Sequence, residues 1–248
     1  MVEADHRALL ASLSPGQRRA LCAQANGPAA LRLALHLGGV AAGGAAIAAG
    51  LPFWWAMMLP QGVLLVFLFT ALHEMIHRTA FRTGWLNDRA ADLLGFLVLL
   101  GPRHFRYFHL AHHRFTHDPE HDPELMGAKP GTLRQYLVYL SGVPDWRWRI
   151  GTLLANALRR NEEPFVPARG KAAVRREARA MLLAYAGVLA LGLGLGGAVL
   201  LWVWVLPLLI GAPFLRGYLL AERGYARFNR GYARAAASGA LPETPGRG

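Results

Sequence analysis

The stretch FWWAMMLPQGVLLVFLFTALHEMIH, residues 53–77, joins a long apolar run to a pair of histidines. The apolar part, Phe53 to Leu72, has the length that a helix needs to cross roughly 30 Å of hydrocarbon at about 1.5 Å per residue. A second apolar run, rich in Gly and Ala, precedes it at residues 33–49, and Gly50-Leu51-Pro52 separates the two. This pattern predicts two membrane-spanning helices joined by a short turn.

A further apolar stretch, residues 181–215, is too long for one crossing, since a single helix of that length would extend about 52 Å. Glycines between residues 192 and 197 mark a turn, after which Trp202, Trp204 and Pro207 belong to a fourth crossing. We therefore expect an all-α integral membrane protein with four transmembrane helices in two hairpins, at about residues 33–49, 53–72, 181–196 and 199–215.

The composition supports this class, with 54% hydrophobic and 17% charged residues. All Lys and Arg residues fall in three blocks, residues 7–32, 78–179 and 216–247. Four crossings place these blocks and both termini on one side, which the positive-inside rule predicts to be cytoplasmic. A net charge of +12 distributed in this way indicates membrane topology rather than nucleic-acid binding. The single Cys22 can form no internal disulfide, and no removable signal peptide is expected at the N-terminus.

The chain divides by composition into three parts. Residues 1–32 are expected to be a cytoplasmic segment, 33–222 the membrane domain and 223–248 an atypical, disordered tail. Within the long polar loop, the apolar segments 92–100 and 133–143 are too short to span a bilayer, which predicts helices at the interface or in a histidine-rich helical cap on the cytoplasmic side. Residues 161–179 are charged and are expected to form a solvated connector.

Histidines concentrate in the loop that follows the second apolar run. His73 and His77 stand four residues apart, so on a continuing helix both imidazoles project from one face. His109 shares a helix face with His112 and His113 in the same way. Such clusters suit iron, copper, nickel or zinc, and these five histidines are the candidate metal ligands.

Several other readings of the histidines are open. His73-Glu74-Met75-Ile76-His77 also fits the H-E-x-x-H pattern of zinc proteases, with Glu74 as the general base, so an intramembrane metalloprotease is an alternative. A surface histidine patch is another. His117 and His121, in a segment broken by prolines, are possible additional ligands. His104 is expected to be structural or to support the ligands, whereas His6 and His36 are expected to be unrelated.

At these positions the chain resembles the membrane fatty acid desaturase family. Residues 73–81, HEMIHRTAF, are similar to its first histidine box, and residues 109–116, HLAHHRFT, with Asp118-Pro119 are similar to its second. The resemblance covers roughly residues 30–222, and it implies a di-iron centre that uses O2 to desaturate lipid acyl chains. It also implies an electron donor such as a ferredoxin or a b-type cytochrome. Arg103, Arg106 and Arg114 are candidates to lie near the lipid headgroup.

The family carries a third box, again His-x-x-His-His, after its last membrane helix. The printed sequence has no histidine after His121, and Arg223 follows Glu222 where the family continues with a histidine. A frameshift or truncation near Glu222 would explain this departure, and it predicts an incomplete iron site with impaired activity. A lipid hydroxylase and a non-catalytic remnant are the remaining alternatives.

Overall fold

The computed structural model describes residues 11–116, 118, 120–125, 130–194 and 197–237, and from residue 222 onward the backbone alone. This part of the chain contains helices and no strands, which confirms the predicted all-α class. In chain order the elements are α2 Pro15–Leu21, α3 Asn26–Ala48, α4 Trp54–His77, α5 Gly84–Leu97, α6 Pro102–Arg114, α7 Leu133–Leu140, α8 Val143–Ala157, α9 Ala168–Gly194, α10 Ala198–Leu200, the π-helix η1 Leu201–Val205 and α11 Leu206–Ala237.

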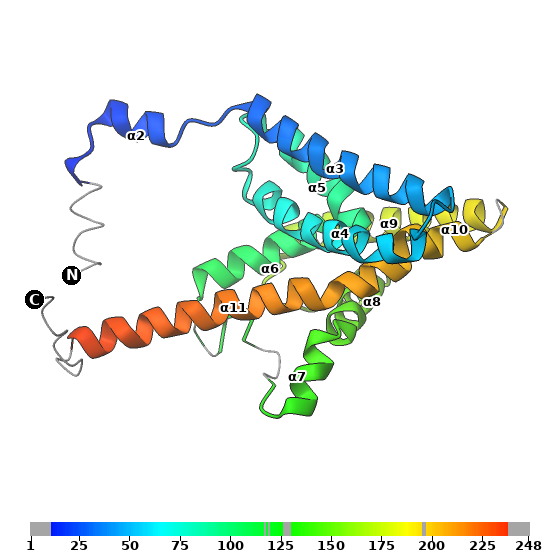
Figure 1. Cartoon of the computed structure of the whole chain (residues 1–248). Coiled ribbons are helices and arrows are strands. Elements are labelled where there is room, and N and C mark those ends of the chain that lie inside the picture. Colours follow the sequence, from blue (N-terminus) through cyan, green and yellow to red (C-terminus); the bar gives the residue numbers. More distant parts are fainter. Residues whose placement is uncertain (1–10, 117, 119, 126–129, 195–196, 238–248) are drawn as a thin grey trace, which may run out of the picture.

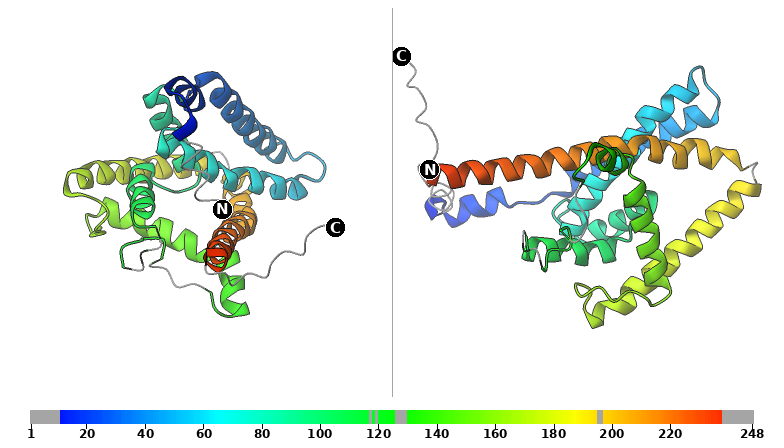
Figure 2. Two further views of the ribbon diagram at one scale, coloured as in Figure 1. Left: turned by 90° about the vertical axis from the view of Figure 1, so that its left-hand side faces the viewer. Right: turned by 90° about the horizontal axis from the view of Figure 1, so that it is seen from below.

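Four segments of the described chain are long and apolar enough to cross a membrane, as the sequence predicts: Pro15–Ala48, Trp54–His77, Ala168–Gly194 and Ala198–Ala221. The helix of the third segment begins at Ala168, so most of the charged residues expected in a solvated connector form the first turns of α9. Residues 223–237, expected in a disordered tail, form the last part of α11. Figure 2 shows this helix extending past the bundle to the end of the molecule where α2 lies.

Helix α4 lies at the centre of the bundle, between α3 and α11 (Figure 1). The closest approach is to α11, at Gly62 and Gly211. A Cβ atom on Gly62 would collide with the backbone carbonyl of Pro207, and one on Gly211 would collide with the carbonyl of Gly62. Small residues let membrane helices approach closely, so these two glycines set the spacing of the bundle.

A buried glutamine connects three of the apolar elements. Gln61 of α4 is 3% exposed, and its side-chain amide donates hydrogen bonds to the carbonyls of Val40 in α3, at 3.1 Å, and Val203 in η1, at 3.2 Å. An amide in hydrocarbon is costly unless it is bonded. The contacts of Gln61 therefore favour one arrangement of these helices.

The turn that follows α4 directs the chain into the polar helices α5 and α6. Arg78 ends α4 in the left-handed conformation, with φ of 58°, and its guanidinium contacts the carboxylate of Asp88 at 2.7 and 2.9 Å. Asn87, which is fully buried, accepts a hydrogen bond from the N–H of Phe81 at 3.0 Å and donates to its carbonyl at 2.8 Å. These bonds fix the chain direction immediately after the first pair of histidines.

Candidate metal centre

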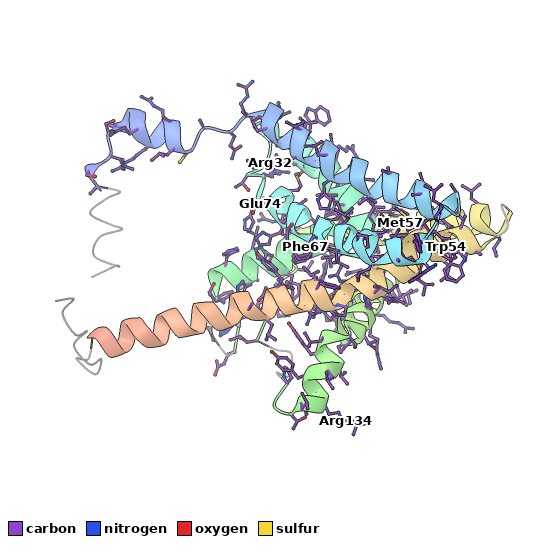
Figure 3. The ribbon with its side chains drawn as sticks, in the orientation of Figure 1. Arg32, Trp54, Met57, Phe67, Glu74 and Arg134 are labelled. Carbon is purple, nitrogen blue, oxygen red and sulfur yellow. The ribbon has the colours of Figure 1, made fainter. Side chains whose placement is uncertain are left out.

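Four histidines from two helices converge at the end of α4. His73 and His77 come from the last turns of α4, and His109 and His113 come from α6. One ring nitrogen of each can be chosen so that all four lie within 4.8 Å of one another. The Nε2 atom of His109 lies 2.9 Å from that of His77 and 2.9 Å from that of His113. Figure 3 labels the neighbouring Glu74 at this end of α4, with Trp54 at the opposite end.

Contacts between α4 and α6 hold the two histidine pairs against each other. The guanidinium of Arg106 donates a hydrogen bond to the carbonyl of Ile76, one residue before His77. The ring of Phe105 packs between Phe69 and His109, with centroid distances of 5.4 and 5.6 Å. On each helix the two histidines, four residues apart, project from the same face, and the packing of α6 on α4 brings the two faces together.

The most enclosed member of the group is His109, which is 6% exposed. Burial, together with the neighbouring His73 and His113, lowers the pKa of His109 to about 3. His109 is accordingly neutral at physiological pH, and a neutral imidazole can offer a lone pair to a metal. The side chain of His73 is 34% exposed, so the group is reachable from one side.

These donors fit a transition metal. Imidazole nitrogens suit iron, zinc, copper and nickel, and the donor type alone selects none of them. His73, His77, His109 and His113 are the residues that could hold such an ion.

His112, the fifth expected ligand, lies outside the four-nitrogen group. Its Nδ1 atom lies 2.8 Å from Oδ1 of Asp122, a fully buried carboxylate that also accepts the backbone N–H of Glu124 at 2.9 Å. A hydrogen on Nδ1 directed at Asp122 leaves Nε2 as the free nitrogen. Carboxylates commonly orient metal-binding histidines in this way.

The remaining histidines have other partners. Nδ1 of His121 lies 2.9 Å from Oδ2 of the exposed Asp118, and His117 lies outside the described residues, as does His6. His104 is 2% exposed, and its Nε2 lies 2.5 Å from Oε2 of Glu163. His36 contacts the carbonyl of Leu64 at 2.8 Å.

Two carboxylates that sequence reasoning did not single out support α6. The carboxylate of Glu177, on α9, accepts hydrogen bonds from the backbone N–H of Arg103 at 3.0 Å and of His104 at 3.4 Å. Burial has the largest single effect on Glu163 and would raise its pKa, but the hydrogen bond and charge of His104 and the hydrogen bond of Asn161 together outweigh burial, so this pKa is lowered. Both acids lie in or beside the charged segment after α8, where nothing in the sequence pattern relates them to His104.

Glu74, the general base that a zinc protease would need, lies at the edge of the histidine group, with its Oε1 3.5 Å from Nδ1 of His73. The side chain of Glu74 is 58% exposed, and its Oε2 accepts a hydrogen bond from the Thr79 hydroxyl at 3.0 Å.

The three candidate headgroup arginines have partners within the protein. Nε of Arg103 lies 3.6 Å from Oε1 of Glu177, and the guanidinium of Arg106 donates a hydrogen bond to the carbonyl of Ile76. Arg114 lies over the ring of Phe115, 5.1 Å from its centroid.

Comparisons with known proteins agree with these features. A family model described as fatty acid desaturase matches residues 48–238. An sn-1 oleoyl-lipid 12-desaturase from Picosynechococcus sp. is 30% identical over 104 residues, which cover 37% of this chain and 30% of that desaturase. No solved structure matches. Because the family model covers most of the sequence, the chain belongs to the fatty acid desaturase family.

Proposed function

We propose that this chain is a membrane-bound, iron- and O2-dependent desaturase of lipid acyl chains. The observation that carries the proposal is the group of four imidazole nitrogens, drawn from two helices and lying within 4.8 Å, at the end of an apolar helix long enough to span a bilayer. His112, oriented by Asp122, is proposed as a further ligand. The family match and the desaturase relative support the reaction class.

Iron bound at these histidines would supply, with O2, the strong oxidant that an unactivated CH2 group requires. The residues of the chain contribute position. Buried His109 and its neighbours present nitrogen donors at the end of the membrane helix α4, and the contact of Arg106 with Ile76 keeps the two histidine pairs together. Apolar side chains of the membrane helices would hold the acyl chain. The histidines and both termini are proposed to lie on the cytoplasmic side of the membrane.

The reaction also requires an electron donor. Removing two hydrogens from the acyl chain releases two electrons, whereas reducing O2 to two waters takes four. A ferredoxin or a b-type cytochrome is proposed to supply the other two. The named relative acts on an oleoyl lipid, which favours a lipid-linked acyl chain as the substrate class here.

Lipid analysis of cells that express the full chain tests the proposal. We expect lipids lighter by two hydrogens, formed only in the presence of O2 and absent with His109→Ala. Lipids that gain one oxygen would instead identify a hydroxylase. No change in lipids, in cells shown to contain the folded chain and a compatible electron donor, would contradict both activities.

Iron content tests the site separately from activity. We expect the purified chain to bind fewer than two irons, because the printed sequence has no histidine after His121 to form a third box. His77→Ala should lower the bound iron. His36→Ala should not, since the ring of His36 is hydrogen-bonded to the carbonyl of Leu64 and is not part of the histidine group. Equal iron in both variants would exclude His77 as a ligand. Sequencing the coding DNA around Glu222 would show whether another reading frame encodes the third box.

A further inference from the structure

A second polar cluster lies where α7 and α8 meet α11 (Figure 1). It consists of Tyr139 from α7, Asp145, Trp146 and Arg149 from α8, and Arg216 from α11. The four residues from α8 and α11 line one small cavity together with apolar side chains of α4 and α11. None of the five takes part in the histidine group.

The cluster carries a net positive charge, because one carboxylate serves two arginines. The Nε and Nη2 atoms of Arg149 each lie 2.9 Å from Oδ2 of Asp145, and Nη1 of Arg216 lies 3.5 Å from Oδ1. The remaining Nη1 of Arg149 donates to the carbonyl of Val98 at 2.6 Å. Arg216 belongs to the fourth apolar segment, Ala198–Ala221, and its side chain is only 16% exposed. Charged residues within membrane segments are costly, and those that persist commonly mark a binding site or a pathway.

Three donors in the same cluster lack an acceptor. The hydroxyl of Tyr139, Nε1 of Trp146 and Nε of Arg216 are buried, and none has a hydrogen-bond partner among the described residues. An unpaired buried donor costs about 1–3 kcal/mol, so three in one place are unusual in a folded protein. All three groups can donate, so a group that satisfies them must offer an acceptor oxygen, as a water molecule or an anion does. The surplus positive charge of Arg149 and Arg216 over Asp145 favours an anion.

Packing holds these donors in place. The guanidinium of Arg216 lies 4.0 Å from the ring centroid of Tyr139, and that of Arg149 lies 4.9 Å from the ring centroid of Trp146. Cation–π contacts of this kind orient both partners. The donors are therefore fixed in position, and a ligand would meet groups that are already arranged for it.

We propose that this cluster binds an oxygen anion, either a carboxylate or a phosphate group. Such a group offers acceptor oxygens to the donors of Trp146 and Arg216, which line the cavity, and to Tyr139, whose ring contacts Arg216 beside it. Its negative charge balances the surplus arginine. Two sources supply this chemistry: the headgroup of a lipid, and an anion free in solution. The position of the cavity, between the apolar helices α4 and α11 and the polar helix α8, suits an anion at the polar end of a lipid.

Thermal unfolding of the full chain in a neutral detergent tests this proposal. Phosphatidylglycerol, oleate and inorganic phosphate are the probes, and phosphatidylcholine is the neutral lipid control. A ligand that binds only the folded state raises Tm by an amount that grows with the logarithm of its concentration above Kd, so we expect at least one anion to raise Tm and phosphatidylcholine to leave it unchanged. A shift with phosphatidylglycerol or oleate alone identifies a lipid source, and a shift with inorganic phosphate identifies a soluble one.

Two conservative variants locate the effect. Tyr139→Phe and Trp146→Phe each remove one donor and keep an aromatic ring, and each should weaken the apparent Kd of the active probe about tenfold, as expected for one hydrogen bond to a charged group. Tyr136→Phe on the same helix and Trp85→Phe on α5 are the matched controls, because both side chains are exposed. The proposal is overturned if no anion shifts the Tm of the wild type, or if the two cluster variants bind as tightly as the controls.

Discussion

At the scale of single residues, the bond between His112 and Asp122 shows what spacing along a helix can and cannot predict. The His-x-x-His-His pattern placed His109, His112 and His113 on one helix, and they all lie on α6. Only His109 and His113 join the four-nitrogen group, because the ring of His112 turns toward Asp122, ten residues further along the chain. No helical period relates these two residues, since α6 ends at Arg114, before Asp122.

Removing the charge of Asp122 should weaken metal binding. Asp122→Asn takes away the carboxylate that orients His112, and the loss of such a partner typically lowers metal affinity about 10- to 100-fold. Competition between the purified protein and a chelator for iron measures this change. Asp118→Asn is the control, because Asp118 pairs with the exposed His121. Equal affinities in the two variants would show that Asp122 does not act on the metal.

Glu74 separates the desaturase proposal from the metalloprotease alternative. In an H-E-x-x-H protease this glutamate is the general base, so replacing it with glutamine would abolish proteolysis. Its carboxylate here contacts the Thr79 hydroxyl and lies 3.5 Å from Nδ1 of His73, with the side chain 58% exposed. Because glutamine keeps the size of this side chain and an oxygen that can accept the same bond, we expect Glu74→Gln to leave both iron content and lipid products within about twofold of wild type. Lipid products lost with full iron retention would contradict this assignment of Glu74.

At the scale of elements, the start of α6 depends on a residue that is distant in sequence. The first N–H groups of a helix have no partner within that helix, and Glu177 of α9 accepts two of those at the start of α6. A carboxylate also interacts favourably with the positive end of the helix dipole. Since α6 carries His109 and His113, α9 contributes to the position of two proposed ligands without touching the metal group.

Truncating Glu177 should therefore loosen α6. Glu177→Ala leaves two N–H groups without their acceptor and should lower the stability of the folded state by about 1–3 kcal/mol. Faster hydrogen exchange in the first turn of α6, together with a lower Tm, would report the change. The control is Glu162→Ala, which removes an exposed carboxylate from the nearby loop. Unchanged exchange in α6 would mean that other contacts determine its position.

The elements themselves were predictable to different degrees. The length of the apolar runs identified the four candidate membrane segments, because every helix that crosses a bilayer needs about 20 predominantly apolar residues. Composition gave the apolar part of α9 and not the point where the helix begins, since charged residues such as Arg175 and Arg176 are good helix formers and extend an apolar helix into a polar region. The same reasoning applies to the end of α11, where Arg and Ala continue the helix beyond Glu222. The supporting acids Glu163 and Glu177 could not be found, because their partners lie on other elements.

At the scale of the whole molecule, the bundle depends on how closely α4 and α11 approach. Gly211 meets the backbone of Gly62, whereas a Cβ on Gly217, further along the same helix, would have no atom within 4 Å. Replacing a helical glycine by alanine removes backbone freedom from the unfolded chain and favours the helix by up to about 1 kcal/mol at either position. The two substitutions therefore share a helix propensity effect and differ in packing.

We expect Gly211→Ala to lower Tm and the yield of monodisperse protein in detergent, because its Cβ would force α11 away from the carbonyl of Gly62. Gly217→Ala should leave Tm unchanged or raise it slightly. Moving α11 should also disturb Arg216, so the anion-dependent rise in Tm should shrink with Gly211→Ala and persist with Gly217→Ala. Equal Tm values for both variants would mean that α4 and α11 are further apart in the membrane than their glycines indicate. In that case the bundle would have to be held by other contacts, such as those of Gln61 with α3 and η1.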